Sequence, residues 1–171
     1  MGIRPARCYK KLERPYTRQS RRKPKKGFVK GVPGSKIHRF EVGNSKGDFP
    51  VVMYVVAKAP VQIRHNALES ARINANKTLN DEFGKTGYFL KVRVFPHHVM
   101  RENPLASGAG ADRFQTGMRK AFGRPIGTAA QVKAGQKIIE ARVGKGQEKI
   151  IRKALKKAAA KLPVPCNIES A

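Results

Sequence analysis

The chain has 171 residues, a formal net charge of +26 and an apolar content of 40%. This length and composition suit one domain with a buried core. No apolar stretch reaches the roughly 20 residues of a membrane span, and no apolar segment of the secretory-signal kind follows the N-terminus. So large a charge repels itself unless a polyanion neutralises it, and nucleic acid is the obvious polyanion.

Residues Met1–Ser35 are predicted to be a basic arm. This segment has no apolar period and contains a single acid, Glu13. By itself we expect the arm to be disordered and to order only against a charged partner. Tyr9, Tyr16 and Phe28 lie among its cations, as is typical of surfaces that stack on bases or sugars. The alternative is a solvated tail that binds nothing. The predicted RNA-binding residues of the arm are Arg4, Arg7, Tyr9, Lys10, Lys11, Arg14, Arg18, Arg21, Arg22, Lys23, Lys25 and Lys26.

Strand and helix signals alternate over residues 36–96, the first part of a predicted single domain at 36–171. A helix is predicted from Asn66, which with Glu69 can form a capping box, to Phe83. Its apolar residues recur at helical spacing and therefore predict one buried face. The predicted strands of this part, of which the second is nearly all apolar and hence central, are Lys36–Val42, Val51–Lys58 and Tyr88–Pro96.

Residues Glu102–Gly117 interrupt this alternation. They are rich in Gly and Ala and have no period, so they predict a long flexible loop. Loops of this length inside compact domains are often functional, and small residues suit close approach to a ligand or to another backbone. The cations predicted to anchor the loop on phosphates are Arg113, Arg119, Lys120 and Arg124.

Beyond the loop, Gln147–Leu162 is the second predicted helix. Its apolar residues face inward, whereas Lys149, Arg152, Lys153 and Lys156 crowd the remaining surface. Apart from Glu148, which lies four residues before Arg152, no acid stands four residues from these cations, so phosphate contact is favoured over a merely solvated face. The predicted strands around this helix are Thr128–Val132, Gln136–Val143 and Cys166–Ile168. Because each helix is followed by a turn and a strand, we expect an α+β fold with both helices side by side on a single, mostly antiparallel sheet.

The remaining motifs do not indicate an enzyme. Gly84-Lys85-Thr86 resembles the end of a P-loop, but Leu79 stands where the upstream glycine belongs and a helix precedes the motif. Two GxxG matches do not join helices as they do in KH modules. His97-His98 with either cysteine lacks the spacing of a structural zinc site. We therefore expect no catalytic residues, no metal and no cofactor, and both cysteines read as reduced thiols of a cytosolic protein.

The run Ala109–Pro125 closely resembles the universal L-sixteen family of large-subunit ribosomal proteins, in the archaeal and eukaryotic branch called L-ten-e. Arg4–Tyr9, Leu68–Arg72 and Phe95–Val99 also resemble that branch, and the short C-terminus resembles its archaeal members. The resemblance implies a hammerhead-like fold docked on large-subunit rRNA in the cytoplasm, with the N-terminal segment threaded into the RNA.

The resemblance also implies what the internal loop does. The loop of the family points toward the peptidyl-transferase region and the acceptor ends of A- and P-site tRNA. The implied tRNA-proximal residues are Ala106, Ser107, Gly108, Ala109, Gly110, Ala111 and Asp112. The implied partners are rRNA, both tRNAs and neighbouring large-subunit proteins, with no membrane. The residues alone leave two other classes of protein open. One is an architectural DNA- or RNA-binding protein outside the ribosome, and the other is an RNA-modifying or nucleotide-dependent enzyme.

Overall fold

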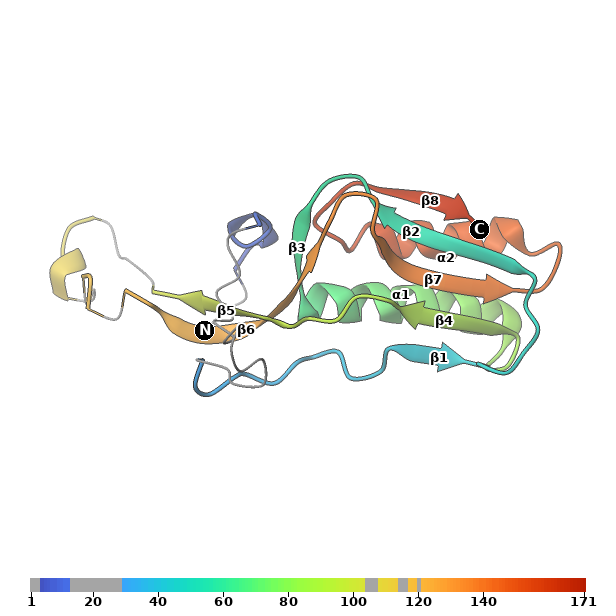
Figure 1. Ribbon diagram of the computed structural model, residues 1–171, viewed down its shortest axis with the longest axis horizontal. Helices are drawn as coiled ribbons and strands as arrows, with labels where there is room; N and C mark the ends of the chain where they lie inside the picture. The colour runs from blue at the N-terminus through green and yellow to red at the C-terminus, as the bar shows by residue number, and fades with distance from the viewer. Residues whose placement is uncertain (1–3, 13–28, 104–107, 114–116, 120) are drawn as a thin grey trace, which may run out of the picture.

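The strands of the computed structural model, which describes residues 4–12, 29–103, 108–113, 117–119 and 121–171, form two antiparallel sheets (Figure 1). The larger sheet has the order β1 (Glu41–Gly43), β4 (Tyr88–Val92), β7 (Lys137–Val143), β2 (Val51–Ala57) and β8 (Cys166–Ser170). The smaller sheet has the order β3 (Val61–Arg64), β6 (Arg124–Val132) and β5 (His98–Glu102). The chain passes between the sheets where β2 leads into β3 and where β6 leads into β7.

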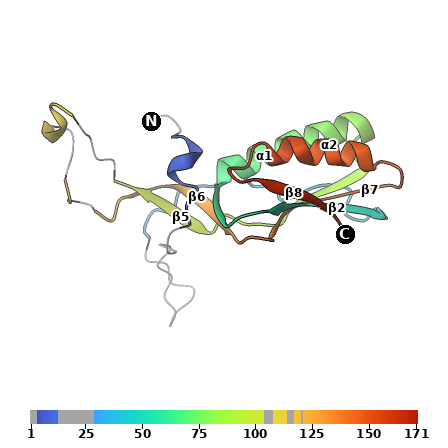
Figure 2. The same cartoon turned by 90° about the horizontal axis from the view of Figure 1, so that it is seen from above.

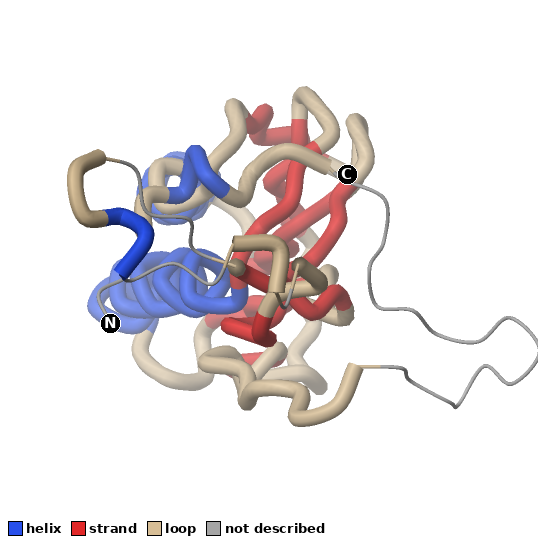
Figure 3. The backbone as a smooth tube through the Cα atoms, turned by 90° about the vertical axis from the view of Figure 1, so that its left-hand side faces the viewer, coloured by secondary structure: helices blue, strands red, loops and turns tan. Residues whose placement is uncertain are grey.

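Two long helices cover one face of the five-stranded sheet. Helices α1 (His65–Phe83) and α2 (Glu148–Ala159) lie side by side on that face, and no described element covers the opposite face (Figure 2). Seen along the long axis, the helices gather on one side of the strands (Figure 3). The predicted α+β class and the pairing of the helices are therefore confirmed.

The main core fills the space between these two layers. The apolar stripe of each helix points at the sheet, because residues three and four apart share one helix face. The strands contribute alternate residues, which point to the same side of a pleated sheet. Fully buried members of this core are Leu68, Ala75, Leu79, Ile151, Ala154, Leu155, Val55, Leu90 and Ile139.

The expectation of a single sheet is wrong, because β3 and β5 form a separate sheet with β6. Strand β3 has four residues and runs without a turn into α1, so no loop signal separates the two elements. Strand β5 has no regular alternation of apolar and polar residues. Both strands are held by pairing with β6, which is distant in sequence. Tertiary pairing of this kind overrides weak local patterns.

Several predicted boundaries also differ from the structure. The strand expected at Lys36–Val42 is the three-residue β1, and the one expected at Thr128–Val132 begins at Arg124. The capping box expected at Asn66 is absent: Arg64 precedes the first helical residue and no side chain caps the helix. His65, the first residue of the helix, uses its side chain elsewhere: its Nδ1 accepts a hydrogen bond from the backbone N–H of Lys36 (2.9 Å). Burial, aided by neighbouring positive charges, lowers the pKa of His65, which favours its neutral, accepting form.

The β5–β6 hairpin extends away from the helices and carries the internal loop at its far end (Figure 1). Gly123 lies at the base of that loop, with φ +77°, and a Cβ there would meet backbone atoms of Glu102 at 2.9–3.1 Å. This close approach requires glycine. Within the segment expected to be irregular, Ala111–Arg113 forms one turn of 3-10 helix, η2.

Candidate nucleic-acid interface

The outward face of α2 is a row of cations. Lys149, Arg152, Lys153 and Lys156 are all exposed, because the inward positions of this helix are taken by apolar residues. None of the four makes an ion pair with another residue in the described part of the chain. Lys157 differs from them, since its Nζ donates to Thr78 Oγ1 on α1 (3.2 Å). The helix thus presents four outward charges that pair with no carboxylate in the part of the chain that the structure describes.

Residues 4–12 of the arm are fixed on the smaller sheet. They include one turn of 3-10 helix, η1 (Ala6–Cys8). Two hydrogen bonds join Gln62 of β3 to this segment: its backbone N–H donates to the Lys10 carbonyl (2.9 Å) and its side-chain amide to the Tyr9 carbonyl (3.0 Å). Arg64 donates to the Arg4 carbonyl (2.7 Å). The expectation that the whole arm is disordered alone is therefore wrong for these residues.

Arg4 and Tyr9 converge on Glu102, the last residue of β5. Arg4 pairs with the Glu102 carboxylate (2.6 Å), and the Tyr9 hydroxyl donates to it (3.0 Å). Burial and the hydrogen bond to Glu102 raise the pKa of Tyr9. The Arg64 guanidinium lies 5.3 Å from the Tyr9 ring centre. These contacts connect the arm to the base of the internal loop.

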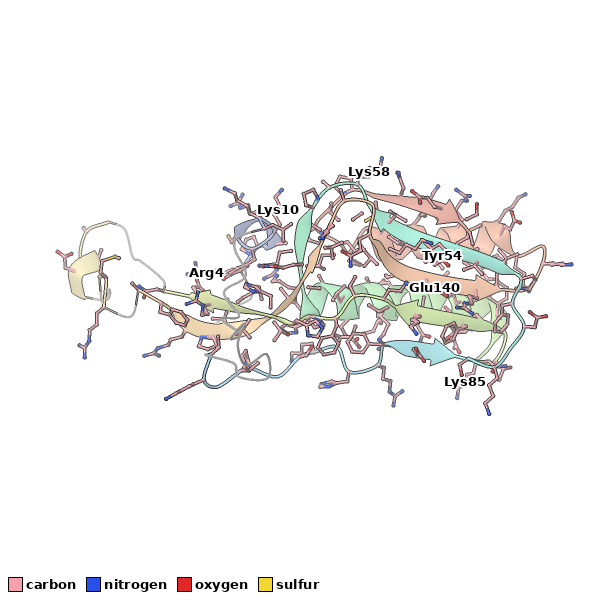
Figure 4. The ribbon with its side chains drawn as sticks, viewed as in Figure 1. Arg4, Lys10, Tyr54, Lys58, Lys85 and Glu140 are labelled. Carbon is pink, nitrogen blue, oxygen red and sulfur yellow. The ribbon has the colours of Figure 1, made fainter. Side chains whose placement is uncertain are left out.

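The other predicted arm residues divide into two groups. Arg7, Lys10 and Lys11 are exposed, and Figure 4 shows Lys10 and Arg4 at the same end of the molecule. The rest of the predicted arm cations lie outside the described residues, namely Arg14, Arg18, Arg21, Arg22, Lys23, Lys25 and Lys26.

The described loop residues lie at the far end of the hairpin (Figure 1). Arg124 is the first residue of β6, Arg113 ends η2 and Arg119 lies in the turn that follows. Gly108, Ala109, Gly110, Ala111 and Asp112 are described, whereas Ala106, Ser107 and Lys120 are not. This end of the molecule is opposite the one that α2 occupies (Figure 1). The structure thus gathers the arm and the loop base together and keeps α2 apart from them.

The open face of the five-stranded sheet carries an ion network that the sequence did not predict. Glu140 on β7 has a side chain that is 1% exposed, yet it accepts from Arg93 (2.5 Å) and from Arg142 (2.5 Å). Tyr54 lies beside it on β2, with the Lys137 ammonium 3.7 Å from its ring centre (Figure 4). Burial alone would raise the pKa of Glu140, but hydrogen bonds from Arg142 and Arg93, and their charges, outweigh it and lower this pKa.

A cavity of about 650 Å³ lies between the arm and the β5–β6 hairpin. Tyr9 and Phe122 contribute aromatic rings to its lining, and Arg101 contributes a guanidinium. In the described parts of the chain no group of three His, Cys, Asp or Glu side chains is placed to hold a metal ion. Among the same residues no helix is long and apolar enough to cross a membrane.

Comparison with known proteins identifies the family of this chain. The family model for ribosomal protein L16p/L10e matches residues 15–169. A protein of Archaeoglobus fulgidus named large ribosomal subunit protein uL16 is 48% identical over 168 residues, covering 98% of this chain and 92% of the relative. Proteins of the same name from Staphylothermus marinus and Methanococcus maripaludis are 50% and 46% identical, each over 98% of this chain and over 93% and 94% of their own. The chain belongs to the ribosomal protein L16p/L10e family, whose members are structural proteins and not enzymes.

Proposed function

We propose that this protein, a structural constituent of the large ribosomal subunit, binds large-subunit rRNA and supports the placement of A- and P-site tRNA near the peptidyl-transferase centre. The arm and α2 neutralise phosphates, and the protein recognises the shape of folded RNA rather than its base sequence. Neighbouring large-subunit proteins are further partners.

The observation that carries this proposal is the outward face of α2. Four exposed cations follow one another there along one helix, and none has a carboxylate partner among the described residues. Acids at i,i+4 stabilise a helix whose cations face only solvent, and of these four cations only Arg152 has such an acid, Glu148. Each cation that is left unneutralised can contact a phosphate and release counterions.

The loop supplies the proposed contact with tRNA. The β5–β6 hairpin carries it away from the body, and the contacts of Glu102 with Arg4 and Tyr9 support its base. Small residues such as Gly108 and Gly110 let a backbone approach a ligand closely. The predicted anchors Arg113, Arg119, Lys120 and Arg124 all follow this segment in sequence.

Sedimentation of the native protein from a cell lysate tests the ribosomal part of the proposal. The lysate is run through a gradient with and without a high-salt wash of the particles. We expect the protein to migrate with the large subunit and to stay there after the wash. Migration with chromosomal DNA would instead favour an architectural DNA-binding protein, and migration in the soluble fraction would also contradict the proposal.

Deletion of Ala106–Gly110 tests the part played by the loop. We expect the deleted protein to fold and to enter large subunits, because the loop lies beyond the buried core, yet to support less translation. The free energy of unfolding should change by less than about 0.5 kcal/mol, as measured by urea denaturation. A loss of stability that parallels the loss of translation would contradict a role in tRNA placement.

A further inference from the structure

Three aromatic rings stand together at the surface where the chain passes from the larger sheet to the smaller one. Phe40 directly precedes β1, whereas Phe95 and His97 lie in the connection from β4 to β5. The ring centres of Phe40 and Phe95 are 5.1 Å apart with planes 24° from parallel, and the centres of Phe95 and His97 are 4.5 Å apart. Such separations are typical of favourable aromatic contacts. Phe95 is thus the middle member of an aromatic column that begins at Phe40 and ends at His97.

The backbone holds this aromatic column in place before any partner binds. The N–H of Val92 donates to the Phe40 carbonyl (2.8 Å), which continues the pairing of β1 with β4. The N–H of His97 donates to the Phe95 carbonyl (2.9 Å) around Pro96, whose ring fixes its own φ. At the inner end of the column Phe40 packs against the buried core. A column that is already formed loses little conformational freedom when a further ring stacks on it.

Packing within the protein does not account for the exposure of the two outer rings. Phe95 is 51% exposed, more than any other phenylalanine that the structure describes, and the His97 side chain is exposed as well. In the described part of the chain, Phe95 is the only ring that His97 contacts. The other side of the imidazole is therefore available as a stacking surface. Exposed apolar clusters mark binding sites, and unstacked RNA bases lie on Phe, Tyr, Trp or His rings.

The charges around the aromatic column indicate what stacks there. Lys36 and Arg39 precede Phe40, both are exposed, and neither pairs with a carboxylate among the described residues. The acid nearest to Phe40 in sequence, Glu41, is already paired with Lys91 (2.6 Å). A nucleotide brings a base for the column and phosphates for these cations, whereas an apolar protein segment would bring apolar contacts alone. Resting on the proposed rRNA binding, we infer that an unpaired base of the large-subunit rRNA stacks on the outer end of this column.

Chemical probing of large-subunit rRNA with bound protein, at single-nucleotide resolution, tests this inference. The variants are His97→Ala, which removes the outer ring, and His97→Tyr, which restores a ring of another kind. His38→Ala is the matched control, because His38 is exposed on the segment that leads to Phe40 and is outside the column. We expect wild type, His97→Tyr and His38→Ala to protect one unpaired nucleotide that His97→Ala leaves reactive. The rRNA affinity of His97→Ala should fall about 5- to 150-fold, as loss of one base–aromatic stack predicts.

The absence of tryptophan from the sequence provides a second readout. His97→Trp and, as its control, His38→Trp each introduce one indole, whose fluorescence reports on its own surroundings. We expect naked large-subunit rRNA to shield the indole of His97→Trp from the quencher acrylamide, because a base covers it. The indole of His38→Trp should stay more accessible to the quencher.

Three results would overturn the inference. The first is rRNA binding with the same footprint and affinity in wild type and His97→Ala. The second is an indole of His97→Trp that stays accessible on naked rRNA, and shielding that appears only in complete large subunits would mean that a neighbouring protein covers the column. The third is failure of the wild type to bind rRNA at all, which would refute the proposed function as well and is thereby distinguished from the other two.

Discussion

The outward face of α2 and the open face of the five-stranded sheet both carry rows of cations, but they use the charge differently. On α2, Lys149, Arg152 and Lys153 make no ion pair with any other described residue. On the sheet, Arg93 and Arg142 share the buried carboxylate of Glu140. A count of Lys and Arg would rank the two surfaces as similar.

The difference predicts which cations are available to RNA. A guanidinium already paired with a protein carboxylate gains less from a phosphate, since the carboxylate would be left buried without its partner. The side chains of Arg93 and Arg142 are 43% and 45% exposed, yet both guanidinium groups are paired with the carboxylate of Glu140. We therefore expect the sheet network to stabilise the fold, and we propose α2 as the surface for phosphates.

Neutralising α2 should have the largest effect on RNA binding. The variant Lys149→Gln, Arg152→Gln and Lys156→Gln removes three proposed phosphate contacts. Each lost contact reduces the log–log slope of affinity against salt by roughly 0.7–0.9, so the slope should fall by about 2–3 and the affinity at about 0.1 M salt by about a hundredfold or more. Titration of large-subunit rRNA at several salt concentrations measures both quantities.

The control for this variant lies on the sheet. Lys91 pairs with Glu41 (2.6 Å) and Lys137 lies over Tyr54, so Lys91→Gln with Lys137→Gln should change the slope by less than about one. Equal slope changes in the two variants would break the distinction between the surfaces.

Removal of the Glu140 charge should affect stability instead. Glu140→Gln leaves two arginines without their anionic partner, so the free energy of unfolding should fall by about 1–3 kcal/mol. The salt slope for rRNA should stay the same or become steeper, because two cations are released on the sheet. Urea denaturation measures the first quantity, and Glu169→Gln, an exposed position on the neighbouring β8, is the control. A loss of stability in the control as large as in Glu140→Gln, or a shallower slope, would contradict this assignment.

The carboxylate of Glu140 also predicts how the free energy of unfolding depends on pH. Its pKa is lower in the folded protein than in the unfolded chain, where a Glu titrates near about 4.3. The network therefore contributes its full stability above that pH and loses it as the pH falls through the lowered pKa. The difference in unfolding free energy between wild type and Glu140→Gln should be constant from pH 7 to about 5 and shrink below about 4. A difference that persists undiminished to pH 3 would assign the stability to packing rather than charge.

Regular, local patterns made much of the fold predictable. The apolar stripe with Ile151 and Leu155 located α2, and the same spacing revealed its cations on the opposite side. Strands β3 and β5 could not be found in this way, because their pairing with β6 is long-range. The Arg93–Glu140 pair joins residues 47 positions apart, and the cavity joins Tyr9 to Phe122. No spacing rule reports such contacts, so the sheet network and the cavity became visible only in three dimensions.

The smallest expected effect separates two lysines of the same helix. Lys153 and Lys157 are both exposed on α2, but only Lys157 donates to Thr78, which holds its ammonium against α1. Lys153→Met should lower the salt slope for rRNA by roughly 0.7–0.9, the value of one phosphate contact. Lys157→Met should lower it by less than half as much, because its charge is already tied to the protein. The same salt titration with both single variants makes the comparison. Equal decreases would contradict this prediction. They would mean that the hydrogen bond to Thr78 does not keep Lys157 from contacting RNA, and that only the position of a cation on α2 matters.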